Sequence, residues 1–582
     1  MRTNTPTPDP AGLGLPDTAT LQRLANEFFA SLPGSQQEAP RAPLPAPDRF
    51  ATASAVSASP TGTGQVPALA PAAASLASAE PALPPLPHDP SLLHGSRLVP
   101  GGVDPVLFGV PGEQELRGLL APSLPASPKG VEPARVSSAP SYYFLESARF
   151  GEPGIRVPGY EHDAAQAVPQ AARPPLDVNL IRRDFPILSE RVNGRQLVWL
   201  DNAATTQKPQ SVIDRISYFY EHENSNIHRA AHELAARATD AYEAAREKVR
   251  GFLNARSVNE VVFVRGATEA INLVAQSWGR ANIREGDEIV VSHLEHHANI
   301  VPWKHLADEK GAKLRVAPVD ESGQIILDEY ARLLGPRTRL VAFTQVSNAL
   351  GTITPAKRMV ELAHAAGATV LVDGAQSVSH MAVDVQDLDA DFFVFSGHKV
   401  FAPTGIGVVY GKEAILNATP PWQGGGNMIR DVTFEHIEYH DAPGRFEAGT
   451  GNIADAVGLG AAIDYVSALG MDNIARYEHE LLLYATRLLK DVPGLTLVGT
   501  AADKASVLSF TLAGFKTEDV GAALNKEGIA VRSGHHCAQP ILRRFGLEAT
   551  VRPSLAFYNT CADVDALVSA LYRLVSGRRP IY

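Results

Sequence analysis

The pattern of apolar and polar residues divides the chain at about residue 176. After that point, short β-branched and aromatic runs alternate with segments whose apolar residues recur at helical spacing, such as TEAINLVAQSWG and PAKRMVELAHAAG. Seven runs are predicted to be strands, at residues 260–264, 287–292, 313–319, 339–346, 369–375, 390–396 and 405–411. Strands that alternate with helices predict an α/β fold with a mainly parallel seven-stranded sheet, covered on both faces.

Before residue 176 the pattern is lost. This region holds 30 of the 44 prolines of the chain, in stretches such as AEPALPPLPHDP, where Ala, Pro and Ser leave little apolar surface to bury. We therefore expect residues 1–175 to be a largely disordered extension. About 400 residues remain after it, which is enough for a large α/β enzyme.

Three apolar segments interrupt this extension. In residues 17–34, DTATLQRLANEFFASLPG, the apolar residues recur at helical spacing and Pro33 and Gly34 end the pattern. So short a helix is marginal alone, so its apolar stripe needs a surface, either on the catalytic part of the same chain or on a partner. With the apolar segments at residues 104–120 and 141–151, it is typical of several short docking motifs on a tether.

Charge and cysteine usage exclude several classes of protein. The formal net charge is −11 and no basic stripe is present, which argues against a nucleic-acid-binding protein. Two cysteines, Cys537 and Cys561, are too few for a disulfide framework and are not spaced for zinc, so a reducing cytoplasm fits. The N-terminus has no signal-peptide pattern and no apolar stretch approaches the length of a membrane span, so neither secretion nor a membrane location is expected.

Reactive polar residues follow four of the predicted strands, where ligands gather in parallel sheets. Gly266, Ala267 and Thr268 end one strand and start a helix, which suits a phosphate but is also an ordinary helix start. His293, His296 and His297 follow another strand and lack carboxylate or cysteine residues at metal-ligand spacing, so no metal site is predicted.

The other two strand ends carry charged groups. Asp373, with Gln376 shortly after it, ends an almost wholly apolar strand, where a carboxylate is costly to bury without a cation. Ser396, His398 and Lys399 follow the next strand; a lone lysine is usually a solvated surface residue, but its surroundings here favour a site. A lysine amine, a buried carboxylate and a phosphate-binding helix start together predict pyridoxal 5'-phosphate as cofactor.

The second part of the chain resembles the cysteine desulfurases of the fold-type I pyridoxal-phosphate family, in particular the SufS-like proteins of group II. The resemblance runs from about Leu176 to Tyr582 and rests on ten motifs in the family's order: LDNAATTQKP, NIHRAAHELA, RGATEAINLVA, EHHANIVPW, SNALGT, DGAQSV, FSGHKVFAPTGIGVVYG, FEAGTGN, RSGHHCAQP and RPSLAFYNT. It implies a large cofactor-binding domain at residues 176–440 and a small C-terminal α+β domain at residues 441–582. Residues 176–200 would contribute to the small domain.

The resemblance also implies a role for each site residue. Lys399 would carry the cofactor as a Schiff base, Asp373 would pair with its ring nitrogen, Gln376 would bind its ring oxygen, and His296 would stack on the ring and take part in catalysis. Asn348 would lie beside the ring oxygen and the substrate. The implied phosphate ligands are Ala267, Thr268, Ser396 and His398, with Thr450 of a second subunit, so that a homodimer is expected. Arg552, with Arg532 nearby, would bind the substrate carboxylate.

The two cysteines are expected to differ. Cys537 lies on a Gly/Pro-bounded loop, VRSGHHCAQP, together with Arg532, His535 and His536. Their positive charge favours the reactive thiolate. It is predicted to be the nucleophile that takes sulfur from L-cysteine as a persulfide and leaves L-alanine. Cys561 lies in a C-terminal helical region with apolar periodicity, YNTCADVDALVSALYRLV, and is interpreted as a buried, inert thiol.

Further implications concern partners and alternatives. In the family, a SufE- or SufU-like acceptor commonly passes the sulfur to iron–sulfur cluster assembly. The extension resembles that of cargo desulfurases of family 2 encapsulin shells, so residues 1–175 are predicted to load the enzyme into such a nanocompartment. Gly451, Pro553 and Asn427 depart from the family's usual residues without removing a catalytic group. The alternatives are a selenocysteine lyase, another fold-type I enzyme such as a kynureninase or an aminotransferase, and a shell-interaction protein with vestigial activity.

Overall fold

A computed structural model of the chain describes residues 176–228 and 232–577. The predicted docking motifs at residues 17–34, 104–120 and 141–151 lie outside the described residues, as does the whole predicted extension.

A seven-stranded sheet forms the centre of this part, and its strand order is β4-β10-β9-β8-β7-β5-β6. Neighbours from β9 to β6 run parallel, while β10 runs antiparallel to both β4 and β9. All seven predicted strands are present, and the α/β fold with a mostly parallel sheet is confirmed. The strands are β4 (Val261–Val264), β5 (Glu288–Ser292), β6 (Lys313–Ala317), β7 (Thr338–Thr344), β8 (Thr369–Asp373), β9 (Phe392–Ser396) and β10 (Gly407–Gly411).

Both faces of the sheet are buried. Successive residues of a strand belong to different apolar clusters: in β9, Phe392 and Val394 pack in one cluster, whereas Phe393 and Phe395 pack in the other. This is the consequence of the alternation of side chains along a strand. It explains why the strands read as unbroken apolar runs and not as alternating ones.

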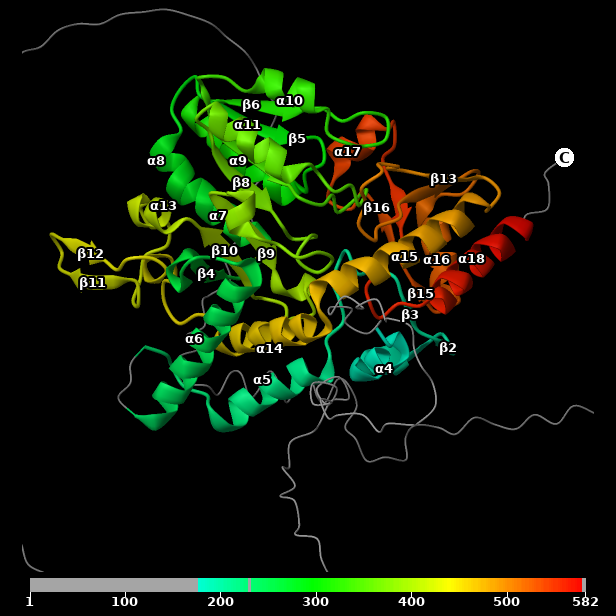
Figure 1. Cartoon of the computed structure of the whole chain (residues 1–582), viewed down its shortest axis with the longest axis horizontal. Coiled ribbons are helices and arrows are strands. Elements are labelled where there is room, and N and C mark those ends of the chain that lie inside the picture. Colours follow the sequence, from blue (N-terminus) through cyan, green and yellow to red (C-terminus); the bar gives the residue numbers. More distant parts are fainter. Residues whose placement is uncertain (1–175, 229–231, 578–582) are drawn as a thin grey trace, which may run out of the picture. The chain divides into compact units, whose positions relative to one another are not determined.

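Helices cover the two faces (Figure 1). Side chains of α7 and α9 belong to one cluster, and side chains of α6, α11 and α14 belong to the other. A π-helical turn at Ala275–Gly279 continues α7 into α8. The helices from α4 to α14 are α4 (Val178–Ile181), α5 (Gln210–His222), α6 (Glu233–Leu253), α7 (Ala267–Val274), α8 (Arg280–Asn282), α9 (Val301–Lys310), α10 (Leu327–Leu333), α11 (Ala356–Ala365), α12 (Val385–Leu388), α13 (Glu413–Ala418) and α14 (Ile453–Leu469).

The C-terminal part has its own sheet and its own apolar cluster, seen in orange and red in Figure 1. Its strand order is β13-β14-β17-β16, and its elements are α15 (Met471–Lys490), β13 (Leu495–Leu497), β14 (Phe510–Leu512), α16 (Thr517–Lys526), β15 (Ile529–Ala530), β16 (Arg532–Gly534), α17 (Gln539–Arg544), β17 (Thr550–Arg552) and α18 (Cys561–Ser576). The early strand β3 (Val198–Trp199) pairs in parallel with β15, so a segment that precedes the large sheet in the sequence packs with the C-terminal part. The domain boundaries at residues 440 and 441 stay a prediction.

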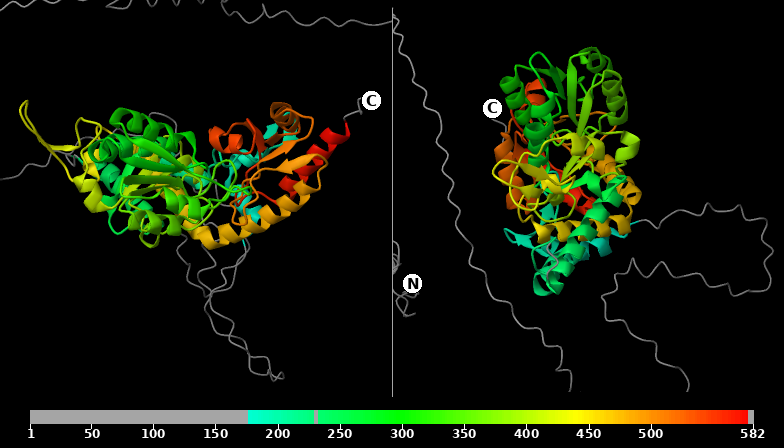
Figure 2. Two further views of the ribbon diagram at one scale, coloured as in Figure 1. Left: turned by 90° about the horizontal axis from the view of Figure 1, so that it is seen from above. Right: turned by 90° about the vertical axis from the view of Figure 1, so that its left-hand side faces the viewer.

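Two short hairpins complete the secondary structure. They pair β1 (Arg191–Val192) with β2 (Arg195–Gln196), and β11 (Ile429–Val432) with β12 (Ile437–Tyr439). Figure 2 shows the second hairpin, in yellow, projecting away from the neighbouring helices. In the described residues no single helix is long and apolar enough to cross a membrane; α14 and α15 meet such a criterion only as a pair, with a bend of 73° between them.

The parallel strands bring four loops to one edge of the sheet. Strands β5, β7, β8 and β9 all end there, because parallel neighbours share their direction. The EHHAN, SNALG, DGAQ and SGHK motifs each follow one of these four strands. The fold therefore assembles at this edge residues that are up to about one hundred positions apart in the sequence.

Candidate active site

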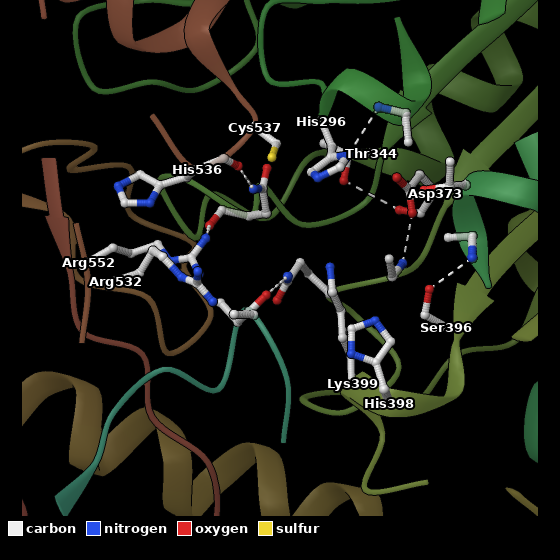
Figure 3. A pocket seen from close by; sticks show the side chains of 18 of the residues that line it. His296, Thr344, Asp373, Ser396, His398, Lys399, Arg532, His536, Cys537 and Arg552 are labelled. Carbon is white, nitrogen blue, oxygen red and sulfur yellow. Dashed lines mark hydrogen bonds between the residues drawn. The ribbon is translucent and has the colours of Figure 1, made fainter. Parts of the chain in front are cut away.

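A cavity of about 490 Å³ lies at this edge of the sheet, between the large sheet and the C-terminal part (Figure 3). Asp373 and Ser396 lie on one side of it, Arg532 and Arg552 on the opposite side, and Lys399 between them. Twelve of the thirteen predicted site residues line the cavity: Ala267, Thr268, His296, Asn348, Asp373, Gln376, Ser396, His398, Lys399, Arg532, Cys537 and Arg552.

Lys399 ends a short turn, η9 (Gly397–Lys399), directly after β9. Lys399 lines the cavity, and among the described residues no hydrogen bond or ion pair involves its amine. Burial lowers the pKa of Lys399 to about 8; Asp373 opposes this effect and Arg552 adds to it. A larger fraction of the amine is therefore neutral at neutral pH than for an exposed lysine, and the neutral amine is the nucleophilic form.

A segment distant in the sequence, residues 205–208, binds the backbone next to Lys399. The carbonyl oxygen of His398 accepts four hydrogen bonds from the segment 205–208: from Thr205 Oγ1 (3.0 Å), Thr206 N (3.0 Å), Thr206 Oγ1 (3.2 Å) and Lys208 Nζ (3.2 Å). Sequence reasoning assigned these residues no role, although they belong to the LDNAATTQKP motif. The motif could have indicated that these residues belong to the site. Their hydrogen bonds to His398 fix the position of the turn that carries Lys399.

Asp373 ends β8 and is 4% exposed. Its Oδ1 accepts a hydrogen bond from Ala375 N at 2.9 Å, and among the ion pairs of residues 176–228 and 232–577 it has none. Burial raises the pKa of Asp373, which means that the folded protein disfavours its charge unless a cation lies beside it. Nearby, Gln376 Nε2 donates to the carbonyl oxygen of Ala203 at 2.7 Å.

Ala267 and Thr268, the first two residues of α7, line the cavity. Gly266 precedes the helix without a side-chain cap, and Ala267 N donates to Ser396 Oγ at 2.8 Å. Gly407 of β10 permits this close packing, because a Cβ atom there would lie 2.4 Å from the Cα atom of Gly266. A positive helix end beside Thr268 and a serine hydroxyl is suited to an anion such as a phosphate.

His296 lies at the end of the loop that follows β5, and its ring orientation is defined. Its Nδ1 accepts a hydrogen bond from Ala298 N at 3.0 Å, so the neutral ring carries its proton on Nε2. Burial lowers the pKa of His296 to about 3, and the charges of Lys399 and Arg552 add to this effect. The ring is therefore neutral at neutral pH and offers an N–H donor to the cavity.

Two arginines face the cavity from the C-terminal part, and one carboxylate joins them. Arg552, 2% exposed, donates to the Asn348 carbonyl oxygen at 2.9 Å. Asp201 Oδ1 lies 3.4 Å from Arg552, and its Oδ2 lies 2.9 Å from Arg532. Burial lowers the pKa of Arg552 to about 10, and Asp201 opposes this. Asp201 is a second residue of the LDNAATTQKP motif whose contribution was missed.

The buried atom Arg552 Nε has no hydrogen-bond partner in the described part, and neither has Asn348 Oδ1. Buried polar atoms without partners are rare in folded proteins. A donor and an acceptor left open beside the same cavity indicate that it binds a polar ligand, and a guanidinium group suits a carboxylate.

Cys537 lies in the loop between β16 and α17, and its thiol is exposed to the cavity. Both His536 and Cys537 adopt left-handed backbone conformations, with φ values of 53° and 54°. The loop is tied to the large sheet by two hydrogen bonds: His297 N donates to the Cys537 carbonyl oxygen (2.8 Å), and Asn348 Nδ2 to that of His536 (2.7 Å). Residues that carry such strain are typical of functional loops.

Neither Cys561 nor Thr450 lines the cavity. Cys561 was interpreted as buried, and this is wrong: it is exposed, because it is the first residue of α18 and the buried stripe of that helix starts at Asp563 and Val564. Thr450, the thirteenth predicted site residue, does not line the cavity of its own chain. Its Oγ1 lies 3.4 Å from Asn226 Oδ1 on an exposed loop.

Comparison with known proteins gives the family. The aminotransferase class-V family model matches residues 198–567. A cysteine desulfurase of Synechococcus elongatus is 71% identical over 402 residues, which are 69% of this chain and 64% of that protein; the chain thus matches less than two thirds of this relative's length. A probable cysteine desulfurase of Mycobacterium leprae is 57% identical over 480 residues, 79% of this chain and 78% of the relative.

Solved structures agree. A cysteine desulfurase of Escherichia coli in an S-sulfonic acid form is 41% identical, with a TM-score of 0.65, and the match covers 69% of this chain and all of that chain. A cysteine desulfurase of Thermococcus onnurineus in its apo form is 36% identical, with a TM-score of 0.66 over 70% of this chain and all of that one.

The cavity fits the cofactor of this family. Pyridoxal 5'-phosphate needs a lysine amine, a carboxylate beside its ring nitrogen and an anion site for its phosphate. The amine of Lys399, the buried Asp373, which has no ion pair among the described residues, and the uncapped helix start at Ala267 meet these needs within one cavity. The chain belongs to the cysteine desulfurases, which are pyridoxal 5'-phosphate-dependent enzymes of the aminotransferase class-V family.

Proposed function

We propose that this enzyme acts on L-cysteine, transfers its sulfur to Cys537 as a persulfide, and releases L-alanine. The observation that carries the proposal is that a free lysine amine and an exposed thiol face the same cavity, beside a buried arginine with an open N–H group. An amino-acid substrate bound by its carboxylate at Arg552 would lie between Lys399 and Cys537.

The residues divide the reaction between them. The cofactor, when bound, supplies an electron sink that stabilises negative charge at the substrate Cα. Arg552 binds and orients the substrate carboxylate, with Arg532 beside it, and Asp201 keeps both guanidinium groups in place. Lys399, whose lowered pKa leaves a neutral fraction, takes the proton from Cα.

Sulfur transfer then falls to Cys537. Its thiolate attacks the substrate Sγ; a sulfur–sulfur bond forms as the carbon–sulfur bond breaks, and the electron pair of that bond goes to carbon. The carbon takes up protons and becomes the methyl group of L-alanine. His296 is placed as a donor for this step through its Nε2–H, since its Nδ1 is already occupied by Ala298 N.

The test is a direct assay of the purified full chain. With L-cysteine and a thiol reductant, we expect equal amounts of L-alanine and sulfide, and visible absorbance from bound pyridoxal phosphate. With L-cysteine and no reductant, we expect one added sulfur atom on the peptide that carries Cys537, because no thiol then removes the sulfur. A parallel assay with L-selenocysteine compares the two substrates. A colourless protein that forms no L-alanine after incubation with pyridoxal phosphate would contradict the proposal.

A homodimer is the proposed working unit. Thr450 does not reach the cavity of its own chain, while the loop that carries it is exposed beside a second hollow lined by Gln423 and Asn427. A second copy would bring its Thr450 to the phosphate end of the site. The molar mass of the purified full chain, measured by light scattering, is expected to be that of two chains.

The group II assignment, the acceptor and the location are also proposals. The support for a SufS-like enzyme is the run of ten motifs, including RSGHHCAQP around Cys537. An exposed Cys537 is compatible with delivery of the sulfur to a SufE- or SufU-like protein for iron–sulfur cluster assembly. We propose that the enzyme works in the cytoplasm, inside an encapsulin shell.

The shell proposal concerns residues 1–175. Its support is the segment LQRLANEFFASLPG, together with the match to the Mycobacterium leprae relative, which is longer than residues 176–582 and therefore extends into residues 1–175. Co-expression of the shell protein with the full chain is expected to give co-purifying enzyme, whereas the chain without residues 1–175 is expected to stay outside while keeping its activity. Equal encapsulation of both chains would reject the proposal.

A further inference from the structure

A fully buried glutamate, Glu295, directly precedes His296, which lines the cavity. Glu295 is 0% exposed, and both of its carboxyl oxygens are used. Its Oε1 lies 2.5 Å from Ser292 Oγ and accepts from Thr344 N at 3.1 Å; its Oε2 accepts from Asn299 Nδ2 at 2.6 Å. These contacts join the end of β5, the end of β7 and the short helix η8 (His297–Asn299).

The direction of every hydrogen bond to an N–H group in this network is determined. Trp303 Nε1 donates to Asn299 Oδ1 at 2.8 Å, and an indole nitrogen can only donate. The Asn299 amide nitrogen must therefore point to Glu295 Oε2. On the other side, the backbone N–H of Thr344 can likewise only donate, so both carboxyl oxygens of Glu295 must accept.

The network connects the two groups that flank the cofactor ring in the proposed function. His296 follows Glu295 directly, and its ring faces the cavity. Thr344 pairs with Asp373 in the register of β7 and β8, and Thr344 Oγ1 lies 3.4 Å from the Asp373 carbonyl oxygen. One carboxyl group thus ties the turn that carries His296 to the strand end that lies beside Asp373.

We propose that Glu295 is a positioning residue that holds His296 and Asp373 at the separation required by the cofactor ring, and that Asn299 and Trp303 fix its orientation. The inference rests on the proposed function, since it concerns the geometry of that same site. Glu295 is not among the residues that line the cavity, so it acts through His296 and Thr344.

The hydrogen bonds from N–H groups to Glu295 keep their direction in both of its protonation states. Burial raises the pKa of Glu295 to about 8, and the hydrogen bonds from Ser292, Asn299 and Thr344 oppose the rise. If the carboxyl group holds a proton, Ser292 Oγ is the one neighbour that can accept it, because the other two neighbours present N–H groups. Both sides that face an N–H group remain acceptors in either state.

Two isosteric substitutions break the network in opposite ways. In Glu295→Gln, the new amide nitrogen must face either Asn299 Nδ2 or Thr344 N, which places two donors against each other. In Asn299→Asp, a carboxylate faces the carboxyl group of Glu295. Each single variant is expected to lower kcat about tenfold or more and to weaken the visible circular dichroism of the bound cofactor, with a smaller change in KM.

The double variant Glu295→Gln with Asn299→Asp should restore the network with its donors reversed. The side-chain oxygen of the new glutamine would accept from Thr344 N, and its amide nitrogen would donate to one oxygen of the new aspartate. Trp303 Nε1 would donate to the other oxygen of that aspartate. We expect kcat within about threefold of the parent and a parental circular dichroism signal, because the rescue replaces each hydrogen bond.

A matched control separates positioning from general stability. Glu260 is also buried, and its two oxygens accept from Arg256 N and Glu413 N. It lies before the start of β4, whereas the cavity residues Ala267 and Thr268 follow the end of that strand. Glu260→Gln is expected to lower the melting temperature but to leave kcat per bound cofactor and the circular dichroism unchanged.

Two results would overturn the proposal. The first is a pair of single variants with lower melting temperatures but parental kcat and circular dichroism, which would make the network merely structural. The second is a double variant no better than the worse single variant. If the parent itself forms no L-alanine, the proposed function fails, and the circular dichroism of bound cofactor still tests the network.

Discussion

Replacing Cys537 with serine is expected to lower the rate of L-alanine formation by about a thousandfold or more, while the protein keeps its cofactor. A hydroxyl group is not ionised at neutral pH and attacks sulfur poorly, and Cys537 is the one cysteine among the cavity-lining residues that the structure describes. Initial rates with L-cysteine and the visible absorbance of the protein measure the two parts of this expectation.

Cys561→Ser is the matched control, because Cys561 is exposed too but begins α18, away from the cavity. It is expected to leave the rate unchanged. A Cys537→Ser protein with parental turnover would show that sulfur leaves the substrate without a protein thiol, and would favour another reaction of the pyridoxal-phosphate enzymes over desulfuration.

Replacing Lys399 with alanine is expected to reduce turnover by a similar or larger factor, about a thousandfold or more. The substitution removes both the amine that binds the cofactor covalently and the group that takes the proton from the substrate Cα. Reduction of the parent with borohydride, followed by peptide mass spectrometry, should find the cofactor on the peptide that carries Lys399. The variant should yield no such peptide.

The control for Lys399→Ala is Lys412→Ala, whose ammonium group pairs with Asp389 and Asp391 outside the cavity. It should keep the parental rate. Added methylamine should partly restore turnover to Lys399→Ala, because a small amine can fill the space left by the side chain, and this rescue separates lost chemistry from lost folding. Full activity with the cofactor attached to a different lysine would contradict the assignment.

The parts of the fold that sequence reasoning predicted are those governed by short-range patterns. Each of the seven strands is an apolar run bounded by turn residues, and a buried parallel sheet needs such runs. The cavity residues that follow β5, β8 and β9 could be found in the same way, because parallel strands bring their ends to one edge, whereas Asn348 after β7 was predicted only from the family resemblance. Their individual roles remain predictions from the family resemblance.

Contacts between distant segments could not be predicted in this way. Asp201 lies 351 positions from Arg552, and Lys208 lies 190 positions from His398, so no periodicity relates them. The error at Cys561 has a different origin. A helical pattern indicates which residues share a face, but Cys561 is at the first position of α18, where the chain has only begun to turn and the side chain still faces solvent.

The contacts of segment 201–208 with the cavity residues limit how far the N-terminus can be shortened in engineered variants. This segment supplies Asp201 to the arginines, the Ala203 carbonyl to Gln376, and three residues to the His398 carbonyl. Removal of residues 1–175 keeps all of these contacts. Removal of residues beyond 200 would take away the hydrogen bonds that fix the turn Gly397–Lys399. Any fusion, tag or protease site intended to release the enzyme from a carrier therefore belongs upstream of Leu176.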